Sequence, residues 1–219
     1  MLLFDLFKRG VPALIKQATE DFAFMLDKDR ELYEAATGLL IDNRPLQIDL
    51  QHEDAAINDT EIKIRRALLQ HFSTSASKDF VFGLMLLTVV QDAERIGDLG
   101  KAIAKAAAIA NHPRRNTQVS VLSAVRDRTL VMFDQTRQAF MGENREAGWQ
   151  VIEDGKANKK TLETFVRDLA ATNEADANLA VTLTLGARAM SRVGSHLSNI
   201  ASAVVLPFHE IRRSSSRGV

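Results

Sequence analysis

The chain has 219 residues, with 28 Lys and Arg balanced by 28 Asp and Glu, so its formal net charge is zero. This balance argues against a nucleic-acid-binding protein held by overall positive charge, and the lack of cysteine excludes disulfides, thiolate metal sites and cysteine nucleophiles. The apolar part of residues 1–10 is too short for a signal sequence or a membrane span, so we expect a cytoplasmic protein.

Prolines and polar breaks divide the first half of the chain into three predicted helices. Apolar residues at helical spacing predict a first helix over residues 12–40, which a polar cluster at 42–45 ends. A second helix is predicted over residues 45–72 and a third over residues 77–110, with Ser77 as its N-cap. The apolar stripe of the second helix contains Leu50, Ile57, Ile64 and Leu68.

The second half repeats this plan after an interruption at residues 111–115. A fourth helix is predicted over residues 117–141, a fifth that ends near Ala171 and a sixth that ends near Val205. No segment shows sustained period-two alternation, so the fold class is all-α, and short connections between long helices predict two tandem, pseudo-symmetric antiparallel three-helix bundles. The expected division is residues 1–111, residues 116–211 and a disordered tail at 212–219.

The two halves share a sequence pattern. Residues Arg95, Ile96, Gly97, Ile103 and Ala106 recur 97 positions later as Arg192, Val193, Gly194, Ile200 and Ala203. This register indicates an internal duplication. The copies differ at two acids, because Glu94 and Asp98 become Ser191 and Ser195 in the second copy.

Glu94 and Asp98 are the first candidates for a functional site. Residues four apart on a helix lie one above the other, so this pair places two carboxylates on one face, and Gly97 between them leaves room for a closely approaching group. Asp54 is expected at the edge of the apolar stripe of the second helix, with Asn58 one turn further on. Asp54, Glu94 and Asp98 could together hold a hard or borderline cation, with Asn58 as a weaker ligand. The alternative is that these acids form ion pairs with Arg65, Arg95 or Lys101.

Other chemistries lack the residues that they need. The sequence has no phosphate-binding loop of the G-x-x-x-x-G-K-[ST] kind, no nucleophile elbow and no Glu-x-x-His metal pair. His196 follows Ser195 directly on a predicted helix, where neighbours point in different directions, so the two are not expected to form a catalytic pair. We therefore expect a protein that is not an enzyme and has no catalytic residues.

The segment Glu94-Arg95-Ile96-Gly97-Asp98, midway along a long helix, resembles the signature of the PhoU family of phosphate-signalling regulators. Related matches fall at residues 53–58 and, one repeat later, at 153–158, where Asp54 and Asp154 stand 100 positions apart. The resemblance extends over residues 12–206.

The resemblance implies two pseudo-symmetric three-helix bundles and a metal site, in which Glu94 and Asp98 match the metal-binding pair and Asp54 matches an acid on the neighbouring helix. Iron, zinc, manganese and magnesium are the candidate ions. It also implies a cytoplasmic adaptor that represses phosphate-starvation signalling through two partners, a membrane sensor histidine kinase and a subunit of a phosphate transporter. Only these partners would bring the protein to the membrane. In the second copy Asn158 and Thr161 replace expected acids, which makes a second metal site doubtful.

Several alternatives remain open at the level of sequence. The same acids could serve a metal-dependent hydrolase or a metal store, or could belong to a structural helical module that binds nothing. The start at residues 3–8 also resembles that of regulators associated with phosphate permeases. Long amphipathic helices are compatible with a homodimer, and no nucleic-acid partner is expected.

Overall fold

The computed structural model describes residues 12–74, 79–142, 144–172 and 176–213, and these contain six α-helices, one short 3-10 helix and no strand. The expected fold class is therefore confirmed. Ser77, the predicted N-cap, and the 3–8 segment lie outside the described residues. The elements are α1 (Ala13–Asp42), α2 (Leu50–Thr74), α3 (Phe80–Ala108), α4 (Asn116–Gly142), α5 (Arg145–Ala171), α6 (Ala177–Val205) and η2 (Phe208–Glu210).

Local hydrogen bonds explain where the helices begin and end. Helix α1 ends at Asp42, two residues beyond the predicted end, because Asn43 adopts a left-handed conformation with φ 57° and its N–H donates to the carbonyl of Gly38. The prediction for α2 was wrong by five residues, since the helix begins at Leu50 and not at Pro45. The side chain of Asp49 accepts hydrogen bonds from the backbone N–H groups of residues 51 and 52 and so satisfies the first turn there.

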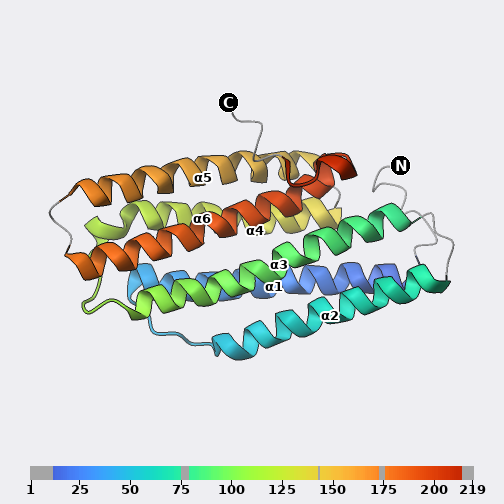
Figure 1. Cartoon of the computed structure of the whole chain (residues 1–219), viewed down its shortest axis with the longest axis horizontal. Coiled ribbons are helices and arrows are strands. Elements are labelled where there is room, and N and C mark those ends of the chain that lie inside the picture. Colours follow the sequence, from blue (N-terminus) through green and yellow to red (C-terminus); the bar gives the residue numbers. More distant parts are fainter. Residues whose placement is uncertain (1–11, 75–78, 143, 173–175, 214–219) are drawn as a thin grey trace.

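The helices lie side by side along the long axis of the molecule, with α1 to α3 on one side and α4 to α6 on the other (Figure 1). The halves meet where α1 packs on α4 and α3 packs on α6. Aromatic rings from the two halves meet at this boundary in tilted pairs. The ring centroids are 4.6 Å apart for Phe22 and Phe140 and 5.7 Å apart for Tyr33 and Phe133. Buried apolar residues from both halves belong to one core. The division into separate domains at residues 111–116 stays a prediction.

The connection between the halves packs against the end of α1. Arg114 donates from Nε to the carbonyl of Leu40 at 2.8 Å and from Nη2 to the carbonyl of Leu39, and its backbone N–H donates to Asn43. Carbonyls at a helix C-terminus have no partner within the helix, so a cation placed there satisfies them. Burial lowers the pKa of this guanidinium.

A buried acid joins α3 to the second half. Asp92 is only 2 % exposed and lies 2.8 Å from Nδ1 of His196, and it accepts a hydrogen bond from Asn199. Two nitrogens of Arg212 donate to its other oxygen at 3.0 and 2.7 Å. Arg212 was expected in a disordered tail; it is placed because this pairing compensates a buried carboxylate, while residues 214–219 lie outside the described part. None of the described helices is long and apolar enough to cross a membrane.

Candidate functional site

The three acids predicted as metal ligands lie on neighbouring helices of the first half. Asp54 is 8 % exposed and stands on α2, one turn before the buried residue Ile57. Glu94 and Asp98 stand on α3, where Glu94 is half-buried and Asp98 is more exposed. Gly97 allows the close approach that the sequence predicted, because a β-carbon there would lie 3.1 Å from the side chain of Ile57.

A fourth acid, Asp29 on α1, belongs to the same cluster and was missed from the sequence. Asp29 is fully buried, and neither of its carboxylate oxygens has a hydrogen-bond partner. A β-carbon on Gly97 would lie 3.4 Å from Oδ1 of Asp29 and 3.6 Å from Oδ1 of Asp54, and the latter oxygen is also buried without a partner. The sequence did hold a signal, because Asp29 falls on the same helical face as Met25 and Leu32, which are both buried.

Burial and the repulsion of neighbouring negative charges raise the pKa of two of these acids, Asp29 and Glu94. Desolvation raises the pKa of Asp29 well above its ordinary range, and the negative charges of Asp54 and Glu94 raise it further. Burial also raises the pKa of Glu94, an effect that Arg95 opposes and Asp98 reinforces. Such shifts in a cluster of carboxylates are typical of a site that is completed by a cation.

Two cations of the protein itself lie among the acids. The ammonium of Lys101 is 2.7 Å from Oδ2 of Asp54 and 3.0 Å from Oδ1 of Asp98. Arg95 lies 3.4 Å from Glu94 and 3.2 Å from Asp98. Burial lowers the pKa of Lys101, but its hydrogen bonds to Asp54 and Asp98 outweigh that effect and raise it overall. The ion pairs considered as the alternative from the sequence are thus present, and Glu61 likewise pairs with Arg65 at 2.6 Å.

The acids of this cluster could bind a metal ion only after a neighbouring side chain moves, and Lys101 is the one that pairs with Asp54 and Asp98. Among the described residues no three His, Asp or Glu side chains converge closely enough to hold a metal ion as they lie. The buried oxygens of Asp29 and Asp54 nevertheless lack partners, and their chemistry suits a hard or borderline cation. A bound ion would compete with Lys101 for Asp54 and Asp98. The metal set of Asp54, Glu94 and Asp98 stays a prediction.

The corresponding place in the second half is built differently. Asn158, which stands 100 positions after Asn58, is 1 % exposed. Its amide oxygen accepts a hydrogen bond from Arg128 at 2.9 Å, and its amide nitrogen donates to Thr129 at 3.1 Å. The side chain of Asn158 on α5 is therefore held by hydrogen bonds to α4. Asp154 is the one acid retained from the first copy's set.

Comparisons with known proteins identify the fold and one domain. Residues 25–107 match the model of the PhoU domain, which covers the part of the chain that carries Asp29, Asp54, Glu94 and Asp98. The crystal structure of PhoU from Pseudomonas aeruginosa superposes with a TM-score of 0.77 at 22 % identity, covering 88 % of this chain and 95 % of that chain. The phosphate transport system regulatory protein PhoU from Streptococcus pneumoniae superposes with a TM-score of 0.78 at 15 % identity, covering 87 % and 92 %. No curated protein sequence matches the chain. The resemblance seen in the sequence is confirmed as a PhoU domain at residues 25–107 and as a shared fold over most of the chain.

Proposed function

Because residues 25–107 match the PhoU domain and most of the chain has the fold of the PhoU structures, we propose that this protein regulates phosphate uptake and phosphate-starvation signalling. The observation that carries the proposal is the domain match itself, which coincides with the acidic cluster on α1, α2 and α3. The pneumococcal structure with the same fold is described as a phosphate transport system regulatory protein. In this proposal the protein is a cytoplasmic, non-enzymatic adaptor whose partners are a sensor histidine kinase and a subunit of a phosphate transporter.

We further propose that the acidic cluster of the first half binds a divalent or ferric ion. Asp54, Glu94 and Asp98 would hold it, and the buried carboxylate of Asp29 beside Gly97 would add negative charge. The ion would supply the positive charge that the cluster lacks. Lys101 would then turn toward solvent, because its side chain is already 25 % exposed.

Elemental analysis tests the metal site directly. The protein is purified without a chelator or an affinity metal, beside the double variant Glu94→Ala/Asp98→Ala. A matched control changes the equivalent positions of the second copy, Ser191→Ala/Ser195→Ala. We expect stoichiometric metal in the wild type and the control, and none in the acidic double variant. Metal-free wild type with a thermal stability unaffected by Mg²⁺, Mn²⁺, Fe²⁺ or Zn²⁺ would contradict the site, since a ligand that binds only the folded state must stabilise it.

Phosphate uptake in the source organism tests the regulatory function. Cells that lack the protein should take up phosphate faster than wild type in excess phosphate and express starvation genes constitutively. A plasmid copy should restore repression. Normal repression in the deletion strain would contradict the proposal. Altered uptake without altered starvation signalling would instead favour a regulator of a phosphate permease, and metal-dependent phosphatase turnover lost in Glu94→Ala would favour a hydrolase.

A further inference from the structure

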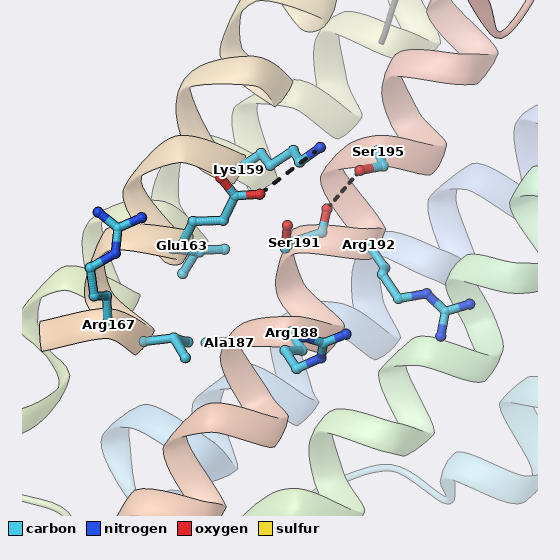
Figure 2. A pocket seen from close by; sticks show the side chains of 10 residues that line it. Lys159, Glu163, Arg167, Ala187, Arg188, Ser191, Arg192 and Ser195 are labelled. Carbon is cyan, nitrogen blue, oxygen red and sulfur yellow. Dashed lines mark hydrogen bonds and ion pairs between the residues drawn. The ribbon is translucent and has the colours of Figure 1, made fainter. Parts of the chain in front are cut away.

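A groove runs between α5 and α6 in the second half, with a volume of about 490 Å³ (Figure 2). Its polar lining consists of four cations and two hydroxyls, with a single acid, Glu163. The cations and hydroxyls are Lys159, Arg167, Arg188, Arg192, Ser191 and Ser195. The groove therefore has an excess of positive charge, although the chain as a whole is neutral.

The groove occupies the place in the second half that the acidic cluster occupies in the first. Ser191 and Ser195 stand where the first copy has Glu94 and Asp98, and each pair lies on the last helix of its half. In the first copy the facing helix α2 brings Asp54. In the second copy the facing helix α5 brings Lys159 to the groove, five positions after Asp154, the counterpart of Asp54. The second copy thus has a groove rich in cations beside the two positions that carry Glu94 and Asp98 in the first copy.

Three of the four cations of the groove have no acidic partner among the described residues. In the described ranges Arg167, Arg188 and Arg192 make no ion pair or hydrogen bond within the protein, and Lys159 approaches Glu163 only to 4.0 Å. Figure 2 shows Lys159 reaching from α5 toward Ser195 on α6. The hydroxyl of Ser195 donates to the carbonyl of Ser191 at 3.0 Å, a local bond that an incoming acceptor can replace.

We propose that this groove binds a phosphate-bearing small molecule, either inorganic phosphate or a phosphorylated metabolite such as a nucleotide. Arginine presents a planar fork of N–H donors that matches phosphate oxygens, lysine adds a point charge, and serine hydroxyls donate further hydrogen bonds. The apolar side chains of Leu162, Val166 and Ala187 line the groove as well, so a ligand with a body larger than phosphate would find apolar contact there.

Isothermal titration with inorganic phosphate and, separately, with ADP at fixed ionic strength tests the groove. The variant Lys159→Gln/Arg188→Gln removes one cation from each wall, at positions that are both exposed and therefore tolerant of substitution. Its control is Lys63→Gln/Arg66→Gln, which removes the same two residue types from exposed positions on α2. We expect the Kd to rise at least about tenfold in the groove variant and to stay unchanged in the control. Equal binding by both variants, or no binding of either anion to the wild type, would overturn the proposal.

Reversing the charge of the groove provides a second, independent test. Ser191→Glu/Ser195→Asp restores the acids of the first copy, and it should abolish anion binding while thermal melting shows a folded protein. Binding of phosphate and ADP alike identifies the phosphate group as the recognised part, and binding of ADP alone identifies a larger ligand. Binding of only an acidic peptide or anionic vesicles would overturn the small-molecule assignment. Glu94→Ala/Asp98→Ala should retain anion binding, so failure of the metal site and failure of the groove are distinguishable.

Discussion

Replacing Asp29 by Asn should stabilise the metal-free protein at neutral and alkaline pH. The Asp29 carboxyl is fully buried without a hydrogen-bond partner, so the folded protein holds its proton more tightly than the unfolded chain does. A raised pKa in the folded state means that wild-type stability is fully present below the ordinary value of 3.8 and is lost as the pH rises through the folded-state pKa. An amide does not titrate, so Asp29→Asn escapes this loss.

The gain should therefore grow with pH. Each pH unit between the ordinary pKa and the raised folded-state pKa costs the wild type about 1.4 kcal/mol, so we expect a gain of about 1–3 kcal/mol at pH 8. For a chain of this length such a gain corresponds to a rise in Tm of roughly 2–12 °C. Urea denaturation of wild type and Asp29→Asn between pH 5 and pH 8, in the presence of a chelator, measures the difference.

The exposed acid Asp27 on the same helix provides the control. Its side chain is 50 % exposed and pairs with Arg137 at 3.0 Å, and an exposed ion pair contributes about 0–1 kcal/mol. Asp27→Asn should therefore change stability by no more than about 1 kcal/mol. If Asp29→Asn were less stable than wild type at pH 8, or if its gain were the same at pH 5 and pH 8, the argument from burial would be wrong.

Three further substitutions test other parts of the structure. Lys101→Gln removes the ammonium that pairs with two of the proposed ligands, so the Kd for Mn²⁺ in a chelator-competition assay should fall about tenfold; an unchanged Kd would show that Lys101 does not compete. Asp92→Ala should lower the free energy of unfolding by about 3 kcal/mol in urea denaturation. Arg212→Ala should lower it by less, because the side chain of Arg212 is 39 % exposed, and equal losses of stability would contradict this ranking. Gly155→Ala places a β-carbon 2.1 Å from Ser198 and should cost about 1–2 kcal/mol, whereas Gly142→Ala meets nothing within 4 Å and should be neutral within about 0.5 kcal/mol by the same assay.

Most of the fold could be predicted because its signals are local. The left-handed turn at Asn43 and the N-cap side chains of Asn144 and Asp176 act within a few residues of the helix ends that they define. The beginning of α2 was misplaced because Pro45 and Asp49 are both acceptable starts, and only the hydrogen bonds of Asp49 decide between them.

The candidate site was predicted in part for the same reason. Glu94 and Asp98 share a face of one helix, which spacing alone reveals, and the apolar stripe of α2 placed Asp54 near them. Asp29 and Lys101 depend on how α1, α2 and α3 pack against one another, which the periodicity of a single helix does not determine. The groove of the second half depends in addition on which cations find acidic partners, a property of the assembled surface.

The pairing of Asp92 with α6 lies between the two proposed sites. Asp92 stands two positions before Glu94, and its partner His196 directly follows Ser195, so the buried contact lies beside both sites at once. If α3 slid along α6, these hydrogen bonds would break and the buried carboxylate of Asp92 would lose its partners. We therefore expect the two helices to move together, so that a rearrangement at one proposed site would also shift the other. Thermodynamic reciprocity then requires that whatever effect the cation has on anion affinity, the anion has on cation affinity to the same degree.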